Sequence, residues 1–435
     1  MDQMDKIVSL CKRRGFVFQG SEIYGGLSNS WDFGPVGCEL KKNIKDLWWK
    51  TYVNSREDIV GLDASLIMNP KVWEASGHVE GFSDPLVECK KCHVRVRADN
   101  IDLNIPCSSC GVKNWSEVKN FNLMFKTFIG PVEESSSIAY LRPETAQAMF
   151  VDFKNILNSN PKKLPFGIAQ MGKAFRNEIT TGNFLFRLRE LEQMEIEYFI
   201  PQPEKDADWQ KYFELWRKEM WKWFDLVGID KTKIHEHEIP DGERAHYSKR
   251  TIDFEYEFPF GLKELYGLAY RTDFDLSNHQ KHSGQSLAYR DPESLKEFIP
   301  HCIEPTWGVD RTILAILLSS FSEDGKRTIL KLKPYLAPYK VAVFPLVSNK
   351  DELISCARDI YLNLKPKLPT VWDDRGNIGK RYYSQDEIGT PWCVTIDYDT
   401  LKDETVTVRD RDSAKQERVK KDRLKEYFYK KLEIS

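Results

Sequence analysis

FGIAQMGKAFRNEITTGNFLFRLRELEQMEIEYF, residues 166–199, is the stretch that decides the fold. Two apolar-rich runs flank a polar turn at Thr180–Asn183 that contains a glycine, and this pattern predicts a long antiparallel hairpin. Side chains alternate along a strand, so charged residues two apart are expected to share a face. These pairs are Arg176 with Glu178, Arg187 with Arg189, and Glu190 with Glu192.

Two interpretations of this charged face are open. It is either a solvated surface joined by salt bridges, which is the commoner case for an arbitrary hairpin, or a platform that holds a phosphate and a cationic amine together. The hairpin alone does not decide between them.

The composition suits a globular protein of more than one domain. A chain of 435 residues with 41% hydrophobic and 30% charged residues predicts two or three domains. The longest purely aliphatic run, Ile313–Leu318, is too short to cross a bilayer. The N-terminal MDQMDKIVSLCKRRGF lacks the apolar core of a secretion signal. We therefore expect a cytoplasmic chain without a membrane partner. The net charge of -2 gives no indication of nucleic-acid binding.

Periodicity predicts the remaining elements of the first 333 residues. A helix is expected at the N-terminus with Ile7, Leu10 and Cys11 inward, and a second after Gly37 with Leu40, Ile44, Leu47 and Trp48 on one face. The helix expected over 141–153 has Pro143 and Glu144 in its first turn. Further helices are expected over 71–78, over 206–227 and after Gly308. Strands are expected at 59–68 and within 251–270. In the 206–227 helix we interpret the aromatic stripe as core rather than as a platform for stacked bases; it comprises Trp209, Phe213, Trp216, Met220 and Phe224.

Four of the nine cysteines have the spacing of a metal site. Cys89, Cys92, Cys107 and Cys110 form C-x2-C-x14-C-x2-C, and each pair of thiolates can reach one tetrahedral ion. A structural zinc knuckle is the favoured interpretation, because four cysteine ligands leave no position for a catalytic water. Four reduced surface cysteines, or two disulfides, are the alternatives.

The last hundred residues have a different pattern. A boundary is expected near 334–338, and a βαβ-like order follows it. Strands are predicted at Val341–Leu346, Thr370–Asp373, Trp392–Asp397 and Thr405–Val408, with a helix at Leu353–Leu364. Ser413 and Gln416 are interpreted as a capping box for the last helix. Arg409–Lys431 holds ten basic and five acidic residues, which fits either a solvated helix face or an RNA-binding surface.

These motifs together resemble the class II aminoacyl-tRNA synthetases, in particular the dimeric glycine–tRNA ligase type, over nearly the whole chain. The segments that carry the resemblance are WDFGPVG at 31–37 with the following LKKNI, FRNE at 175–178 with RLRELEQMEIE, IEPTWGVDR at 303–311, and the tail from 373 to 412. The resemblance implies an α+β catalytic domain at 1–333, built on a mixed, mainly antiparallel sheet with helices. It also implies a zinc-knuckle insertion at 86–115 and a C-terminal α/β anticodon-binding domain at 334–435.

The activity implied is the ATP-dependent ligation of glycine to tRNA(Gly) through a glycyl-adenylate, by a homodimer that uses Mg²⁺. The residues implied in catalysis are Arg176, Arg311 and Glu264. Arg176 is expected to bind the α-phosphate and the substrate carboxylate, and Arg311 to contact adenine or the γ-phosphate. Glu264 is expected to coordinate Mg²⁺. The residues implied in ATP binding are Arg176, Asn177, Glu178, Phe186, Arg187, Leu191, Glu264, Leu265, Gly308 and Arg311. Glu178 is the implied acceptor of the adenine amino group.

Glycine has no side chain, so its recognition must use the ammonium and the carboxylate. The residues implied in glycine binding are Arg97, Glu144, Glu195, Glu304, Thr306 and Gly308. Such a pocket needs only to exclude larger amino acids, and no segment resembles an editing domain.

The sequence departs from the family pattern at three positions. Leu191 stands where an aromatic usually stacks on adenine, Thr306 stands where serine is usual, and Ser65 lies near the place of a proline in the first class motif. The last difference falls in the motif that the resemblance links to the dimer interface. Two alternative functions are a ligase for serine, threonine or proline, and a catalytically inactive relative that binds nucleic acid. The retained Arg176, Glu178, Glu264 and Arg311 argue against the second.

Overall fold

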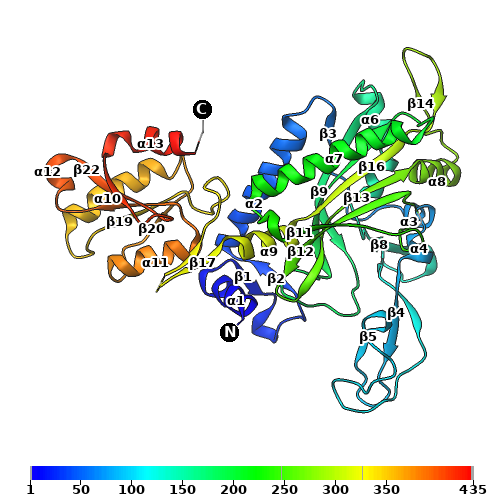
Figure 1. Ribbon diagram of the computed structural model, residues 1–435, viewed down its shortest axis with the longest axis horizontal. Helices are drawn as coiled ribbons and strands as arrows, with labels where there is room; N and C mark the ends of the chain where they lie inside the picture. Colours follow the sequence, from blue (N-terminus) through cyan, green and yellow to red (C-terminus); the bar gives the residue numbers. More distant parts are fainter. Residues whose placement is uncertain (1, 246, 326, 433–435) are drawn as a thin grey trace.

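The computed structural model describes residues 2–245, 247–325 and 327–432. A large N-terminal part is built on a seven-stranded sheet of order β11-β12-β13-β16-β10-β9-β3, and a smaller C-terminal part lies beside it (Figure 1). Every neighbouring pair of the large sheet is antiparallel except β3 with β9. The expected mixed, mainly antiparallel sheet is thus confirmed.

The predicted hairpin forms the middle of this sheet. β9 (Phe166–Phe175) pairs with β10 (Glu190–Ile200), from Phe166 opposite Phe199 to Phe175 opposite Glu190. The arginines and Glu178 were expected on strand faces, and this is wrong, because they lie in the loop 176–189. Beyond Phe175 one more bond crosses the hairpin, from the backbone N–H of Arg176 to the carbonyl of Arg189 at 2.9 Å. The backbone N–H of Asn177 then donates to the carbonyl of Leu123 at 2.8 Å, and the pairing ends.

The other strands extend the sheet on both sides. They are β16 (His301–Gly308), β13 (Gly261–Thr272), β12 (Arg250–Phe258), β11 (Ile234–Glu238) and β3 (Ile59–Gly61). The strand predicted at 59–68 is therefore shorter. After Gly61 the chain leaves the sheet edge, and the backbone N–H of Ala64 donates to the side-chain oxygen of Gln170 at 2.9 Å.

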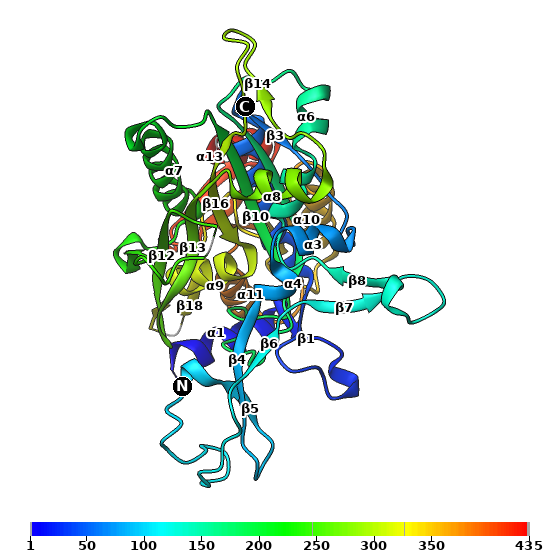
Figure 2. The same ribbon diagram turned by 90° about the vertical axis from the view of Figure 1, so that its right-hand side faces the viewer.

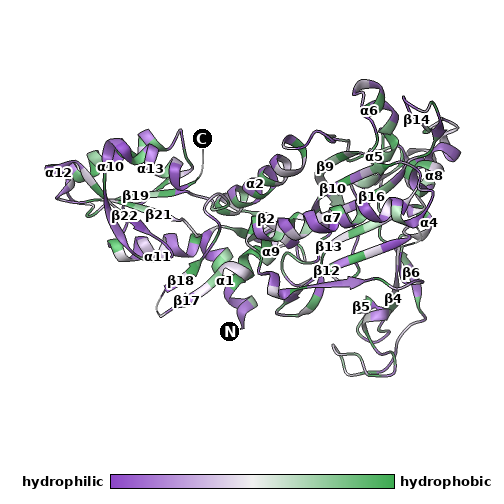
Figure 3. Cartoon of the chain, turned by 45° about the horizontal axis from the view of Figure 1, so that its top comes forward, coloured by the Kyte–Doolittle hydropathy of each residue, from purple (hydrophilic) through white to green (hydrophobic). Residues whose placement is uncertain are grey.

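One face of the sheet is covered by a hydrophobic helix layer. Its helices are α1 (Gln3–Arg14), α2 (Pro35–Trp49), α7 (Asp206–Val227) and α9 (Val309–Ser320). The predicted stripe of α7 is buried in the same core as Met194 and Ile196 of β10. Hydrophobic and hydrophilic residues alternate along α7 (Figure 3), as expected for a helix with one buried face.

The opposite face carries α5 (Ala146–Val151), α6 (Phe153–Ser159) and α8 (Phe274–Ser283). α5 begins three residues after Pro143, so the prediction of Pro143 and Glu144 in its first turn is wrong. The carbonyls that would have joined the helix accept side-chain donors instead: Pro143 O from Arg176 Nε at 3.0 Å, and Thr145 O from Gln170 Nε2 at 2.7 Å. The helix predicted at 71–78 is divided into α3 (Pro70–Ala75) and α4 (His78–Gly81) by Gly77, whose φ is 80°.

A projecting insertion follows α4. β4 (Ser83–Glu88) pairs with β5 (Arg95–Arg97) and β6 (Lys119–Asn122). Next comes a hairpin of β7 (Phe125–Phe128) and β8 (Ile138–Leu141). Figure 2 shows that β4–β5 and β7–β8 extend away from the main body in different directions.

The C-terminal part is a second α/β unit with its own core. Its strands are β20 (Thr370–Trp372), β19 (Val341–Pro345), β21 (Trp392–Ile396), β22 (Thr405–Asp410) and β23 (Gln416–Lys420), in that spatial order. Its main helices are α10 (Asp351–Leu364), α11 (Ile378–Ile388) and α13 (Leu424–Lys431). The α/β class expected for this part is confirmed.

The expected capping box of the last helix is wrong. Gln416 begins strand β23, which pairs with β22, and α13 begins only at Leu424. Ser413 lies in the turn between the two strands and donates to Asp410 Oδ1 at 2.7 Å. The basic run is therefore spread over strands, a turn and a helix. One of its arginines, Arg409, is buried against Asp386.

The two parts are joined by polar contacts. Asn43 of α2 donates to the carbonyls of Leu336 and Ala337, each at 3.1 Å. Arg327 Nε lies 3.1 Å from Asp386 Oδ2 of α11. Within the described residues, no helix combines the length and apolarity needed to cross a membrane.

Lys41 is a buried cation that joins α2, β10 and α9. Its Nζ lies 2.7 Å from Glu192 Oε2 and 3.3 Å from Asp310 Oδ1, and its side chain is 12% exposed. Lys45 contacts the other oxygen of Glu192. Burial raises the pKa of Glu192, but Lys41 and Lys45 outweigh it and hold that pKa below its ordinary value.

We expect Lys41→Met to lower the free energy of unfolding at neutral pH by ~3–5 kcal/mol, because Asp310 loses its paired cation and Glu192 keeps only Lys45. The folded-state pKa of Glu192 is depressed, so its contribution is present above the unfolded pKa and is lost as the pH falls through the folded pKa. The difference between wild type and variant should therefore shrink towards about pH 4. Urea unfolding of the wild type and the variant at neutral pH and at about pH 4 measures this difference in the free energy of unfolding.

Lys42→Met is the matched control on the same helix. It breaks the pair with Asp46, in which the side chains are 64% and 60% exposed. Its effect should stay below about 0.5 kcal/mol. Equal losses of stability in the two variants would contradict the role of Lys41.

Candidate active site

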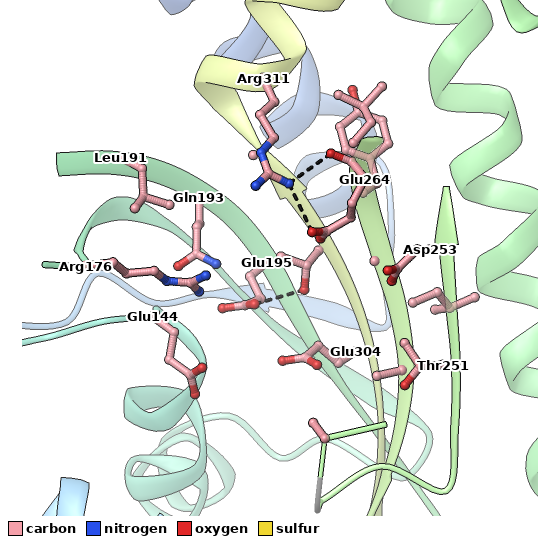
Figure 4. Close-up of a pocket in the computed structure, with 18 of the residues that line it drawn as sticks. Glu144, Arg176, Leu191, Gln193, Glu195, Thr251, Asp253, Glu264, Glu304 and Arg311 are labelled. Atoms are coloured by element: carbon pink, nitrogen blue, oxygen red, sulfur yellow. Dashed lines mark hydrogen bonds and ion pairs between the residues drawn. The ribbon is translucent and has the colours of Figure 1, made fainter. Parts of the chain in front are cut away.

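A cavity of about 380 Å³ lies against the sheet where β10, β12, β13 and β16 meet the start of α9 (Figure 4). Most of the predicted site residues line it: Glu144, Arg176, Glu178, Phe186, Arg187, Leu191, Glu195, Glu264, Leu265, Glu304, Thr306, Gly308 and Arg311. Strand alternation gives β10 two roles. Leu191, Gln193 and Glu195 face the cavity, whereas Met194 and Ile196 pack under the helices.

Arg311 is fixed in the first turn of α9. Its Nη1 donates to Glu264 at two points, the backbone carbonyl at 2.9 Å and Oε2 at 3.1 Å. Its Nε donates to the carbonyl of Phe186 at 3.2 Å, and its guanidinium lies 4.4 Å from the centroid of the Phe186 ring. Desolvation raises the pKa of Glu264, but Arg311 outweighs it and holds that pKa below its ordinary value. The charge of Arg311 is thus oriented before any ligand arrives.

The loop between β9 and β10 supplies a second cation and an acceptor. Arg176 Nε donates to the carbonyl of Pro143 at 3.0 Å, and its guanidinium lies 5.5 Å from the ring centroid of Phe82. Glu178 Oε2 is buried and receives no hydrogen bond from the described residues. The nearest cation is Arg187, at 3.8 Å. Burial raises the pKa of Glu178. A free buried acceptor of this kind is suited to a ligand N–H.

The other end of the cavity is acidic. Glu144, Glu195 and Glu304 are each less than one-tenth exposed and lie close together (Figure 4). Glu195 accepts hydrogen bonds from Thr145 and from Thr306, the latter at 2.9 Å. Burial raises the pKa of Glu304 to about 8, and burial followed by the charge of Glu144 raises the pKa of Glu195. Such carboxylates favour the arrival of a cation, which restores their charged form.

Glu144 differs from its two neighbours. Its Oε2 lies 3.2 Å from Nε2 of His78. Burial raises the pKa of Glu144, but His78 and then Arg271 outweigh burial and hold it well below its ordinary value. The cavity therefore has an acidic end with one firmly ionised carboxylate and, at the other end, fixed guanidinium groups. This arrangement can hold an ammonium group and phosphate oxygens in one ligand set.

Sequence analysis missed several lining residues. Gln193 lies between Leu191 and Glu195 on the same strand face, so alternation alone was enough to find it. Its Oε1 is buried without a partner among the described residues. Asp253 of β12 also lines the cavity, and burial, with the charge of Glu264, raises its pKa to about 7. The loop residues Glu243, Arg244 and Tyr247 had no recognisable sequence signal.

Two predicted residues lie outside the lining. Arg97, on β5, is engaged by Asp84 at 2.7 Å and Asp99 at 2.6 Å, and it holds the base of the insertion. Asn177 contributes its backbone N–H to Leu123 O. Leu191, which stands where an aromatic was expected to stack on adenine, lines the cavity, and Phe186 packs its ring against Arg311.

The four cysteines of the insertion meet at one point. The Sγ atoms of Cys89 and Cys110 are 3.6 Å apart, and those of Cys92 and Cys107 are 3.7 Å apart. All nine cysteines are free, so the alternative of two disulfides is wrong. An edge of ~3.8 Å joins the sulfur atoms of a tetrahedron whose metal–sulfur bonds are about 2.3 Å. The donor set therefore fits a tetrahedral metal ion.

The matched families follow the two parts of the chain. Residues 128–320 match the family described as tRNA synthetase class II core domain (G, H, P, S and T). Residues 340–431 match the family described as Anticodon binding domain.

Three curated relatives, all named glycine–tRNA ligase, are similar to the chain along its length. The protein from Caldanaerobacter subterraneus subsp. tengcongensis is 48% identical over 99% of each chain. That from Clostridium tetani is 49% identical over 99% of each chain. That from Thermobifida fusca is 49% identical over 99% of this chain and 98% of its own.

Proposed function

Since the chain belongs to the glycine–tRNA ligase family of class II aminoacyl-tRNA synthetases, we propose that it makes glycyl-adenylate in the cavity of the large sheet and transfers glycine to tRNA(Gly). A carboxylate oxygen of glycine attacks the α-phosphorus of ATP, and the bond to the bridging oxygen of the leaving pyrophosphate breaks. A hydroxyl of the terminal tRNA ribose then attacks the glycyl carbonyl and releases AMP. The observation that carries the proposal is one cavity with fixed guanidinium groups at one end and buried carboxylates at the other.

Arg176 and Arg311 are assigned to the phosphate end. Arg176 would bind the α-phosphate and the glycine carboxylate, and Arg311 would cover adenine or reach the γ-phosphate, with Arg187 beside them. Positive charge aimed at the developing phosphate charge lowers the barrier most when it is already oriented, and carbonyl contacts orient both arginines. The free Oε2 of Glu178 would accept the adenine amino group.

The remaining ATP contacts are assigned from the positions of the residues around the cavity. Leu191 and Phe186 would form the apolar walls of the adenine site, and Leu265 and Gly308 its floor. Asn177 does not line the cavity, and its proposed part in ATP binding is to hold the backbone next to Arg176 in place.

Glu264 and Asp253 are the carboxylates that would hold Mg²⁺ with ATP. They project from the paired strands β13 and β12, and burial together with the charge of Glu264 raises the pKa of Asp253 to about 7. A divalent cation relieves that repulsion, and carboxylate oxygens are its usual ligands. When bound, the ion neutralises charge on the phosphate oxygens.

Glycine is assigned to the acidic end. Glu144, Glu195 and Glu304 would receive its ammonium, and Thr306 with Gly308 would close the pocket around the α-carbon. Arg97 would reach the substrate only if its pairs with Asp84 and Asp99 opened.

Structural zinc is the metal we propose for the insertion. Cys89, Cys92, Cys107 and Cys110 would hold it, and each cysteine pair lies in a turn closed by a backbone bond, from His93 N to Cys89 O and from Gly111 N to Cys107 O, both 2.8 Å. We assign residues 86–115 to this insertion, 1–333 to the catalytic domain and 334–435 to the anticodon-binding domain. Thiolate ligands require a reducing compartment, which supports the cytoplasm.

The tRNA is proposed to contact both domains. A second cavity, of about 410 Å³, is lined by Arg14 at the end of α1 and by Arg375, Lys380 and Tyr383 near α11. Cationic side chains bind backbone phosphates, and exposed aromatic rings stack on unpaired bases. A homodimer is the other proposed assembly. Ile23 and Tyr24 are 88% and 86% exposed, as apolar side chains that meet a second copy would be.

The experiment that tests the function is pyrophosphate exchange into ATP. Exchange should depend on glycine, and alanine or serine at equal concentration should give at least about tenfold less. A ligase for another small amino acid would show the reverse preference. An inactive relative would show no exchange with any amino acid.

Arg176→Ala should lower glycine-dependent exchange by at least about a hundredfold, because a preoriented charge at the transition state is lost. Arg189→Ala is the matched control, since Arg189 lies in the same loop but does not line the cavity. It should leave exchange within about twofold. Near-normal exchange in Arg176→Ala would refute its phosphate role.

Cys107→Ser should abolish the zinc that copurifies with the protein, and residues 89–115 should become sensitive to trypsin, because the site supplies much of the folding energy of so small a segment. Metal analysis and limited proteolysis measure the two effects. Cys38→Ser, at an exposed cysteine of α2, should change neither. The assignment would be overturned if the wild-type insertion stayed resistant to trypsin after a chelator had removed its zinc.

A further inference from the structure

Arg271 ties Glu304 to helix α8. It lies on β13 with 1% of its side chain exposed. Its Nη1 donates to Glu304 Oε1 at 2.6 Å. Its Nε and Nη2 donate to the two oxygens of Asp275 at 2.8 and 2.9 Å. A bidentate guanidinium–carboxylate pair has a fixed geometry, so the orientation of Glu304 depends on the helix that carries Asp275.

Gln147 ties Glu144 to the same helix. Its Nε2 donates to Glu144 Oε1 at 3.0 Å and to Asp275 Oδ1 at 2.9 Å. Its Oε1 lies 2.8 Å from Nε2 of His279. Burial lowers the pKa of His279 to about 4, so the ring is neutral at pH 7. An amide oxygen only accepts, so His279 carries its hydrogen on Nε2. The amide is therefore held at both ends.

Aromatic rings and an imidazole stiffen this connection. The guanidinium of Arg271 lies 3.8 Å from the ring centroid of Tyr247 and 5.3 Å from that of Phe150. Cations over ring faces are attracted to them, and burial strengthens the attraction. At the far end, the second oxygen of Glu144 faces His78. Each member of the connection thus has more than one contact that resists its displacement.

The connection reaches the cavity through Glu144 and Glu304, and the ring of Tyr247 beside Arg271 also lines the cavity. Gln147, Asp275 and Arg271 do not line it. Any effect that these three inner residues have on binding therefore acts through the residues they hold, and only Glu144 and Glu304 among these carry a negative charge into the cavity.

We propose that Gln147, Asp275 and Arg271 are positioning residues that fix the separation of Glu144 and Glu304, and thereby set how strictly the cavity rejects amino acids larger than glycine. This inference rests on the proposed function. An ammonium group is bound well only where both carboxylates reach it, and an added methyl is excluded only if the walls hold their place. Rejection of one methyl by packing alone amounts to about 10- to 200-fold, so a small movement of one wall removes much of it.

Gln147→Met cuts the connection without changing any charge. Methionine has a similar length and no donor for Glu144 or Asp275. We expect KM for glycine to rise about tenfold, and the preference for glycine over alanine in kcat/KM to fall about tenfold, with KM for ATP within about twofold. The wild type measured alongside tests the proposed function separately, because absence of glycine-dependent exchange there would refute the function itself.

Asp275→Asn is the second variant, and it decides the question if Gln147→Met does not fold. It weakens the same connection from its centre. When both fold, the double variant should lose no more discrimination than the more severe single variant, since both changes cut one connection. Ser277→Ala is the control on the same helix, where Ser277 bonds only to Asp273 among its side-chain partners. It should leave both KM values and the preference unchanged.

The outcomes separate positioning from general stability. A selective rise of the glycine KM with lost discrimination, and a melting temperature close to that of the wild type, supports the proposal. Equal rises of the glycine and ATP KM values would mean a merely structural role and would overturn it. So would a folded Gln147→Met or Asp275→Asn enzyme with the wild-type glycine KM and the wild-type preference.

Discussion

A carboxylate that leaves water costs several kcal/mol unless a cation or a set of hydrogen bonds replaces its hydration. The acidic end of the cavity buries Glu144, Glu195 and Glu304 together, and the fold supplies one buried guanidinium, Arg271, and one imidazole, His78, against them. These two partners face three carboxylates. The ammonium group of the proposed substrate would add a further positive charge at this end.

Strand β10 places buried carboxylates that need compensating partners on both faces of the sheet. On the cavity side it presents Gln193 and Glu195, and on the helix side it presents Glu192 to Lys41. Asp310, which precedes Arg311, meets the same lysine. The ion cluster behind the sheet thus fixes the start of α9 and with it the guanidinium of Arg311, while buried carboxylates line the cavity in front.

The proposed phosphate end of the cavity differs in the groups that orient its arginines. Its cations are held by backbone carbonyls and ring faces, so little reorganisation is needed when phosphate binds. Phe186 takes the aromatic role beside Arg311, which leaves Leu191 as an apolar wall. The aromatic expected at 191 was a partner for adenine, and Leu191 offers an apolar side chain in the cavity at that place.

The sequence by itself determined the central hairpin, the buried stripe of α7, the first turn of α9 and the cysteine cluster, because each is set by local periodicity or by short spacing. The family resemblance carried by its motifs also brought most of the predicted site residues to one cavity. Only the tertiary structure decided where strands end and which side chains meet. The pairing of β9 with β10 does not continue past Arg176 because Asn177 bonds to Leu123, and Gln416 joins a strand because β22 offers it an edge. Arg271 and Asp275 are only four residues apart, but Gln147 joins α5 to Asp275 of α8 across 128 residues, and no local pattern encodes that contact.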